Sequence, residues 1–178
     1  MPKVTEDREY WLRGSITGVA PLLQPVAHAL LQARAEVNTL LVDFPDAFLW
    51  EKPGGTASPG FHLQHLAGVL DRLLTYARDQ ALTPHQLEEL AGEGAPQPGQ
   101  ATIAELLNRF NIQIDKALDQ VSQTPEAELL FPRPVGRARM PSTVLGLLFH
   151  AAEHTQRHTG QLIVTVRVLK AANHRQPL

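Results

Sequence analysis

Three histidines, His150, His154 and His158, occupy every fourth position of the segment HAAEHTQRH. Residues four apart on an α-helix lie about 40° apart around its axis and one turn apart along it, so two neighbouring histidines can direct their imidazoles at one ion. All three together would rotate through about 80° and span about 12 Å, which is too wide for a single ion. We therefore expect His154 to bind a divalent metal together with one of the two outer histidines.

A third ligand must come from a facing element, and the segment FHLQHL supplies His62 and His65 on adjacent helical turns. By helical spacing, His65 shares a mostly apolar stripe with Phe61 and Gly68, whereas His62 is displaced by about 60° toward the edge of that stripe. We therefore predict His65 as the third ligand. Three histidines leave an open position for water or substrate on zinc or another borderline divalent ion. The remaining histidines have no partner at ligand spacing and are expected to be ordinary surface or groove residues: His28, His85 and His174.

An ion on three histidines can support two kinds of chemistry. It can lower the pKa of a bound water to about 7 so that hydroxide attacks a substrate, or it can bind a thiol as thiolate and present it to an electrophile. Hydrolysis calls for a carboxylate base near the water, but helical spacing aims neither Asp71 nor Glu153 at the predicted ligands, and we expect both to have structural roles. The zinc-protease motif is excluded because it requires glutamate directly after the first histidine, where Thr155 stands. The lack of an evident base slightly favours thiol transfer.

Further side chains are predicted to lie around the ion or its approach. Gln161 follows His158 by three residues on the same face, so it is a candidate to line the pocket or to hydrogen-bond a bound water. Trp50 precedes the helix of His65 and is a candidate for the pocket rim. Arg72 is expected to be a surface arginine with its stem along the apolar stripe. A basic loop is a candidate for steering an anionic substrate or thiol cofactor: Arg133, Arg137 and Arg139.

Helices must position these side chains, and the chain shows four long helical patterns separated by segments rich in proline and glycine. The long helices are expected at about residues 17–43, 58–80, 102–122 and 143–170, with a short extra piece at about 84–90. N-cap signals mark their starts at Ser58-Pro59, Thr83-Pro84, Thr102 with Glu105, and Ser142. We predict an all-α fold in which residues 1–178 form a single domain, most simply a four-helix bundle with ligands projecting into its interior.

Composition narrows the classes of function. The chain has 178 residues, no cysteine, 43% hydrophobic and 19% charged residues, and a formal net charge of -2. Any metal must therefore rely on nitrogen and oxygen ligands, and nucleic acid is not an expected partner. The N-terminal segment has no apolar signal-peptide core, and no run of about 18 uncharged apolar residues occurs, so we expect a soluble, cytoplasmic protein without membrane contact.

The segments SPGFHLQHLAGVLDRLLTYA and LLFHAAEHTQRHTGQL resemble the DinB/YfiT-like family of metal-dependent enzymes. The resemblance implies a four-helix bundle with an up-down-down-up arrangement. It also implies zinc or nickel held by one histidine of the second helix, His65 in LQHL, and by the H-x-x-x-H pair of the fourth, His154 and His158 in EHTQRHTGQ. The side chains predicted to line the pocket or to support a ligand are then His150, Gln161, His62 and Trp50.

Relatives in this superfamily include thiol S-transferases that use bacillithiol and a mycothiol-dependent maleylpyruvate isomerase, while many members carry only a hydrolase label. The resemblance therefore implies a metal-dependent enzyme acting on a small molecule, either a hydrolase or an S-transferase with a low-molecular-weight thiol as cosubstrate. The alternative is a non-catalytic bundle in which the ion staples two helices and the chain acts through dimerisation or a partner. Apolar positions on the first and last helices also lead us to expect a homodimer.

Overall fold

The computed structural model describes residues 8–173, which form an all-helical fold. Its α-helices are α1 (Gln24–Leu40), α2 (Pro59–Ala77), α3 (Pro84–Gly92), α4 (Ile103–Gln123) and α5 (Val144–Asn173). Two short 3-10 turns precede α1, η1 (Tyr10–Leu12) and η2 (Pro21–Leu23), and three lie between later helices, η3 (Asp46–Phe48), η4 (Pro53–Gly55) and η5 (Glu126–Glu128). The prediction of an all-α fold with four long helices and one short helix is confirmed.

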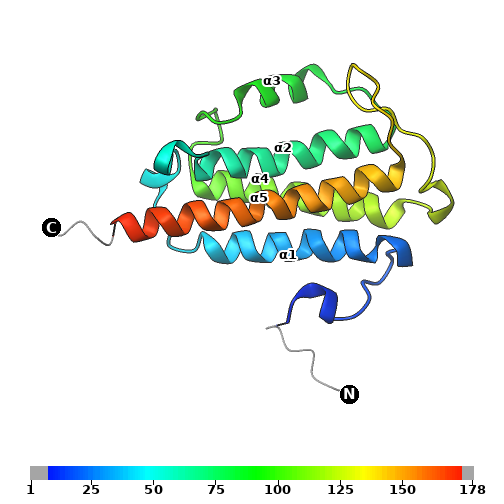
Figure 1. The fold of residues 1–178 in the computed structure, drawn as a ribbon, viewed down its shortest axis with the longest axis horizontal. Coiled ribbons are helices and arrows are strands. Elements are labelled where there is room, and N and C mark those ends of the chain that lie inside the picture. The colour runs from blue at the N-terminus through cyan, green and yellow to red at the C-terminus, as the bar shows by residue number, and fades with distance from the viewer. Residues whose placement is uncertain (1–7, 174–178) are drawn as a thin grey trace.

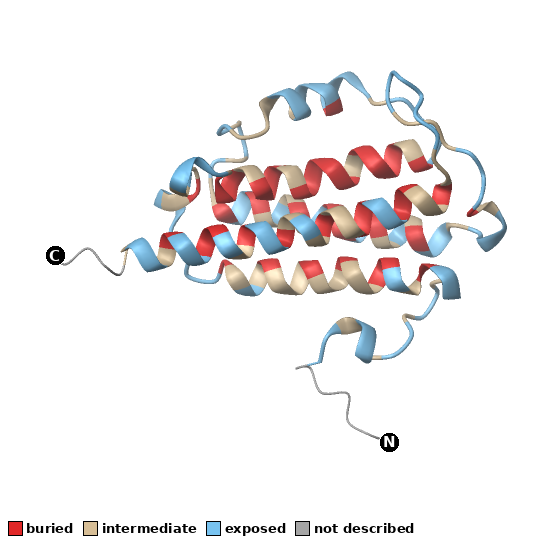
Figure 2. Ribbon diagram, in the orientation of Figure 1, coloured by how far each residue is buried: buried red, intermediate tan, exposed pale blue. Residues whose placement is uncertain are grey.

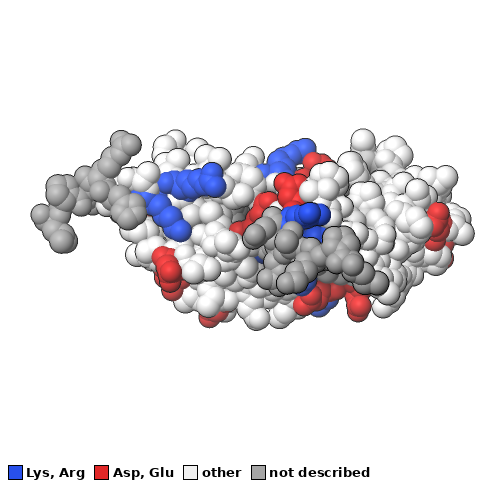
Figure 3. Space-filling model, turned by 90° about the horizontal axis from the view of Figure 1, so that it is seen from below, with Lys and Arg blue, Asp and Glu red and all other residues white. Residues whose placement is uncertain are grey.

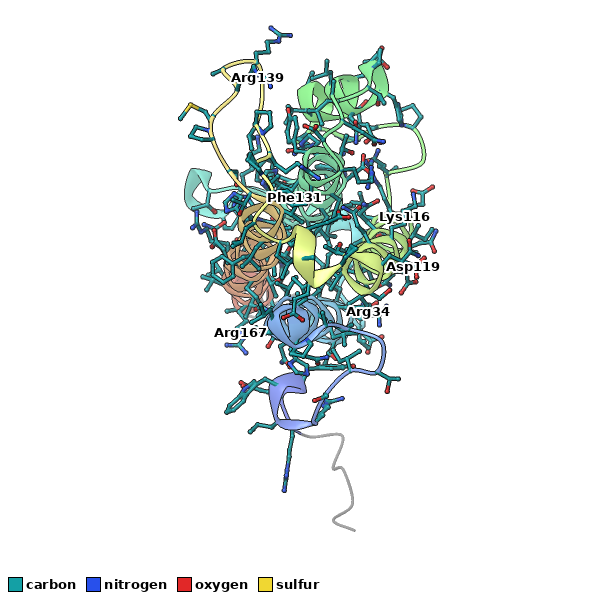
Figure 4. The ribbon with its side chains drawn as sticks, turned by 90° about the vertical axis from the view of Figure 1, so that its right-hand side faces the viewer. Arg34, Lys116, Asp119, Phe131, Arg139 and Arg167 are labelled. Atoms are coloured by element: carbon teal, nitrogen blue, oxygen red, sulfur yellow. The ribbon has the colours of Figure 1, made fainter. Side chains whose placement is uncertain are left out.

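The four long helices occupy the corners of a bundle, which Figure 4 shows nearly end-on. Helix α2 contacts α5 and α4, and α1 contacts the same two helices, so α1 and α2 lie diagonally opposite each other. Figure 1 shows α1 and α5 running in one direction and α2 and α4 in the other. These directions are compatible with the arrangement that the family resemblance implies. Helix α3 lies outside the bundle, along α2 (Figure 1).

The apolar stripes of the four long helices meet in one core, and Figure 2 shows the buried residues as red segments on these helices. Each long helix contributes large side chains that are almost fully buried: Leu30 from α1, Leu66 and Leu70 from α2, Phe110 from α4, and Leu148 and Leu162 from α5. Burial of apolar surface is favourable by about 25 cal/mol per Å². This packing fixes the rotation of each helix about its axis, and with it the direction in which the histidines point.

The N-caps predicted at Ser58, Thr83 and Thr102 are confirmed, because each side-chain oxygen accepts a hydrogen bond from the backbone N–H three residues later. The last helix differs from the prediction by one residue. Thr143, rather than Ser142, supplies the capping oxygen, whose distance to the backbone N of the third following residue is 3.0 Å. Helix α5 accordingly begins at Val144.

The first helix is shorter than predicted, because α1 begins at Gln24 rather than at Thr17. Gly18 has a positive φ of 83°, and Pro21 opens a 3-10 turn, so regular α-helical hydrogen bonding starts only after these residues. Leu22 lies in this turn and is 57% exposed. The other predicted helix ends lie within three residues of the observed ones.

Charged side chains of both signs are mixed on the face of the molecule that Figure 3 shows, in keeping with a net charge of -2. Some of the charges join helices: Arg34 of α1 and Asp115 of α4 form an ion pair with an N–O distance of 2.6 Å. Within residues 8–173, no helix combines the length and the hydrophobicity that crossing a bilayer requires.

Candidate metal centre

The packing of α2 against α5, which run in opposite directions, places two pairs of histidines face to face. The Nε2 atom of His65 lies 3.0 Å from Nε2 of His154. One turn away, Nδ1 of His62 lies 3.2 Å from Nδ1 of His158. The pairs lie opposite each other because the helices are antiparallel, so the turn from His62 to His65 along α2 lies beside the turn from His158 back to His154 along α5. Four imidazoles from two helices therefore share one cluster.

Three of these residues meet the geometric requirement for a shared ion: one ligand atom each from His65, His154 and His158 lies within 4.8 Å of the other two. Two imidazole nitrogens bound to one ion at about 2.1 Å are separated by roughly 3.0–3.4 Å. The separation of 3.0 Å between the His65 and His154 nitrogens fits this range. Nδ1 of His154 is buried without a hydrogen-bond partner among the described residues. Packing and the contact with His65 therefore orient the His154 ring.

Burial favours the neutral form of three histidines of the cluster, His62, His154 and His158, and the neutral form is the one that binds metal. Burial, together with the charge of His65, lowers the pKa of His62 to about 4. Burial and the charges of His65 and His154 lower the pKa of His158 to about 4. Burial also lowers the pKa of His154. At neutral pH, His154 and His158 of α5 therefore each have a lone pair to offer an ion.

His62 lies deeper in the fold than helical spacing predicted. It is only 3% exposed, whereas the pattern placed it at the edge of the apolar stripe. The difference arises because α2 is covered by α3 and α4 as well as by α5, so residues around most of its circumference are buried. Phe61 adds to this enclosure by stacking on His65, with ring centroids 5.4 Å apart and planes 10° apart.

A carboxylate that contacts the histidine cluster comes from a residue that sequence reasoning missed. Glu93 follows α3, and its Oε2 lies 2.7 Å from Nδ1 of His65, while its Oε1 lies 2.8 Å from Nη1 of Arg72. Burial alone would raise the pKa of the Glu93 carboxyl, but the hydrogen bond from His65 and the charge of Arg72 outweigh it, so the pKa is lowered. The sequence signal was weak, since Glu93 is an acidic residue between two glycines in a linker without helical spacing to His65.

Arg72 is a buried ion-pair partner, 7% exposed, and not the surface arginine that the sequence analysis predicted. Gly68 provides room for the pair, because a Cβ there would lie 2.6 Å from Nη1 of Arg72 and 2.8 Å from Oε1 of Glu93. Gln64 holds the linker in place, through hydrogen bonds of 2.8 and 2.9 Å to the backbone of the two residues that follow Glu93. The prediction was wrong because an arginine stem along an apolar stripe gives no sign of a covering linker.

The two carboxylates considered from the sequence have structural partners, as expected. Oδ2 of Asp71 accepts a hydrogen bond from Nε2 of Gln86 at 2.6 Å, which ties α3 to α2. Glu153 lies on the outer side of α5, 2.8 Å from Nδ1 of His150 and 3.2 Å from Nη2 of Arg157.

His150 lies beside the triad rather than within it. Its side chain is 47% exposed, and its ring centroid is 5.2 Å from that of His154. Together with Glu153 and His154, it forms a second group of side chains with ligand atoms within 4.8 Å of one another. This second group is more exposed than the group containing His65, and both groups share His154.

An open groove of about 630 Å³ reaches the histidine cluster at His62 and lies between α5 and the 3-10 turn η4. Gln161 and His62 lie on its wall. The full lining is Pro53, Thr56, Ala57, His62, Arg157, Gly160, Gln161, Val164, Thr165 and Val168. Trp50, predicted as a rim residue, is not part of this lining and packs over Gly60, where a Cβ would lie 2.6 Å from the indole ring.

The basic loop lies away from the candidate centre. Nε of Arg133 donates to the backbone oxygen of Ala77, at the C-terminal end of α2, with a distance of 2.9 Å. This end of α2 is about 18 Å along the helix from His65, at 1.5 Å per residue. Figure 4 shows Arg139 at the tip of the loop, pointing away from the bundle. The expected steering of an anionic substrate toward the centre has no support in this placement.

Two of the histidines without predicted partners lie apart from the cluster. His28 contacts the backbone oxygen of Gly14 at 2.9 Å, and His85 is an exposed side chain 3.4 Å from Glu89. His174 lies outside the described residues.

The fold and these side chains define a class of protein: an all-helical bundle with a candidate three-histidine metal centre between α2 and α5. Residues 29–162 match the DinB superfamily, and this range contains the three histidines and Glu93. Because the match covers most of the chain, the chain belongs to the DinB superfamily, which confirms the family expected from the sequence. No curated protein matches the chain.

Proposed function

We propose that this chain is a metal-dependent enzyme in which His65, His154 and His158 hold a divalent ion of the zinc or nickel class. The observation that carries the proposal is the 3.0 Å approach of two imidazole nitrogens from different helices, with a third imidazole beside them. An ion bound there would supply Lewis acidity to a water or a thiol. Three protein ligands are typical of catalytic sites, which keep one position open, whereas structural sites are closed by four.

The groove beside His62 supports a small molecule as the substrate. Val164 and Val168 provide an apolar wall, Gln161 provides an amide for hydrogen bonding, and Arg157, which also pairs with Glu153, adds a guanidinium group. Pockets with mostly apolar walls and a few polar groups are typical of small-molecule sites. An amphipathic substrate with an anionic end matches this lining.

Between the two reactions, transfer of a low-molecular-weight thiol has more support than hydrolysis. The carboxylates that contact the histidines are already engaged: Glu93 with His65 and Arg72, and Glu153 with His150 and Arg157. To act as a general base toward a water, either carboxylate would first have to break these contacts. A thiol needs less help from the protein, because its thiolate is itself the nucleophile.

Metal analysis of the chain purified without a histidine tag tests the ion. We expect about one zinc- or nickel-class ion per chain, and we expect His65→Ala to abolish its retention. His85→Ala is the matched control, because His85 is 78% exposed and lies outside the cluster. Full metal retention by His65→Ala would overturn the ligand assignment.

The alternative function is a non-catalytic bundle whose ion staples α2 to α5, and the observation in its favour is that the three histidines come from only these two helices. Cobalt substitution separates the two functions. A change in the visible spectrum on adding azide or a thiol indicates an exchangeable position and supports catalysis. An unchanged spectrum indicates a saturated site and supports the staple.

We also propose that the chain forms a homodimer. Exposed apolar side chains just before α1 and on α5 support it, namely Leu22 at 57% and Phe149 at 59% exposure. Sedimentation of the purified chain tests this proposal, and a monomer at all concentrations would contradict it.

A further inference from the structure

Glu93 and His65 are joined by a hydrogen bond whose direction follows from their chemistry. A carboxylate ion only accepts hydrogen bonds, so the proton between Oε2 of Glu93 and Nδ1 of His65 belongs to the histidine. When Nδ1 of a neutral imidazole carries the proton, the lone pair is on Nε2. In His65, Nε2 is the atom that faces His154 at 3.0 Å.

Independent contacts hold the Glu93 carboxylate in this position. Nη1 of Arg72 lies 2.8 Å from Oε1 of Glu93, and neither Nη1 nor Oε1 makes a hydrogen bond elsewhere among the described residues. The Glu93 side chain is 9% exposed, and so is that of Arg72. Gln64 fixes the backbone directly after Glu93, and Gly68 leaves the space that the ion pair occupies. The carboxylate is therefore built into the fold and cannot turn freely toward solvent.

We propose that Glu93 is a positioning residue that fixes the tautomer and the ring orientation of His65, so that Nε2 is presented to the ion shared with His154 and His158. This inference rests on the proposed metal centre. Glu93 contacts the ring at Nδ1, whereas the face toward His154 is formed by Nε2, so Glu93 acts through His65 and is not a ligand. Carboxylates that accept the second N–H of a ligating histidine orient the ring and raise its basicity, and their removal weakens metal binding about 10- to 100-fold.

Zinc affinity and histidine tautomer are the two measurements that test Glu93. Affinity is measured on the full chain by competition with a chromophoric chelator, for Glu93→Ala and for Glu93→Gln, which keeps the side-chain shape. Glu88→Gln is the matched control, because Glu88 is an exposed glutamate on the neighbouring helix α3. The His65 tautomer is read from nitrogen NMR of histidine-labelled, metal-free protein. Melting curves establish that each variant is folded, and Glu93→Gln carries the test if Glu93→Ala does not fold.

We expect zinc affinity to fall about 10- to 100-fold in Glu93→Ala and less in Glu93→Gln, with no change in Glu88→Gln. We also expect the metal-free native chain to show His65 protonated at Nδ1, and Glu93→Ala to lose this preference. An unchanged tautomer overturns the proposal, even with weaker zinc binding, because packing of the linker alone would then explain the affinity. If the native chain binds no zinc, the proposed metal centre fails, while the tautomer in metal-free protein still decides the role of Glu93.

Discussion

His65 and His154 face each other across the contact between α2 and α5, with their Nε2 atoms 3.0 Å apart and 89 positions apart in the sequence. Two lone pairs at this distance repel, so a proton or a cation must lie between the nitrogens. Glu93 accepts the hydrogen bond from Nδ1 of His65, so in the neutral form of His65 the lone pair is on Nε2, which then accepts from Nε2 of His154. An ion at this position would replace that proton, so metal and proton compete for the same place.

Substituting the α5 histidines one at a time should distinguish the proposed ligands, His154 and His158, from their neighbour His150. We expect His154→Ala and His158→Ala each to reduce bound zinc from about one ion per chain to near none, because either change leaves only two of three ligands. His150→Ala should retain the ion, since His150 is outside the group formed with His65. Metal content by elemental analysis checks these outcomes. Loss in His150→Ala with retention in His158→Ala would instead assign the ion to the more exposed group containing Glu153.

His62 should affect the strength of metal binding but not the number of ions. Its Nδ1 lies 3.2 Å from Nδ1 of His158, so it supports a ligand from the side of the groove. We expect His62→Ala to weaken zinc binding by about tenfold or more with the stoichiometry kept near one. Titration against a competing chelator measures both quantities. His28→Ala, remote from the cluster, should match the native chain, and a complete loss of zinc in His62→Ala would make His62 a ligand.

The metal-free protein should lose stability as the pH falls from about 6.5 to about 4. The pKa of His62 and that of His158 are both lowered from 6.5 to about 4 in the folded chain. Between these values the unfolded chain binds more protons than the folded chain, so the free energy of unfolding decreases with decreasing pH. Thermal melts of chelator-treated protein at pH 7.5 and pH 5 check this, with about 2–4 °C expected for each kcal/mol lost. His62→Gln should reduce the pH dependence of the melting temperature. An equal pH dependence in that variant would contradict the contribution assigned to His62.

Gly68→Ala should destabilise the chain although alanine is the better helix former. A Cβ at this position would lie 2.6 Å from Nη1 of Arg72, so the buried ion pair with Glu93 must shift. We expect a loss of roughly 1–3 kcal/mol in the free energy of unfolding, measured with denaturant, and weaker zinc binding. The control is Gly160→Ala on α5, where a Cβ meets nothing within 4 Å, and its stability should stay equal or rise by about 1 kcal/mol. Equal effects of the two substitutions would contradict the role given to the ion pair.

Much of the fold could be predicted because its signals are local. The caps at Ser58, Thr83 and Thr102 are single side chains that bond to backbone three residues away, so the sequence around them contains all of the interaction. Helical periodicity likewise showed which face of each long helix is apolar. The start of α1 was less predictable, because Gly18, which has a positive φ, and Pro21, which opens a 3-10 turn, interrupt the helix expected from about residue 17.

Some features of the candidate centre could likewise be predicted from local sequence, and others could not. The sequence by itself determined that His154 and His158 share a helix face and that His65 lies on an apolar stripe, because both follow from the pitch of an α-helix. Only the tertiary structure decided that His62 is buried, that Arg72 is enclosed, and that Glu93 bonds to His65. These depend on how α3 and its linker fold back over α2, and such contacts between distant segments are set by packing of the whole chain rather than by spacing along any one helix.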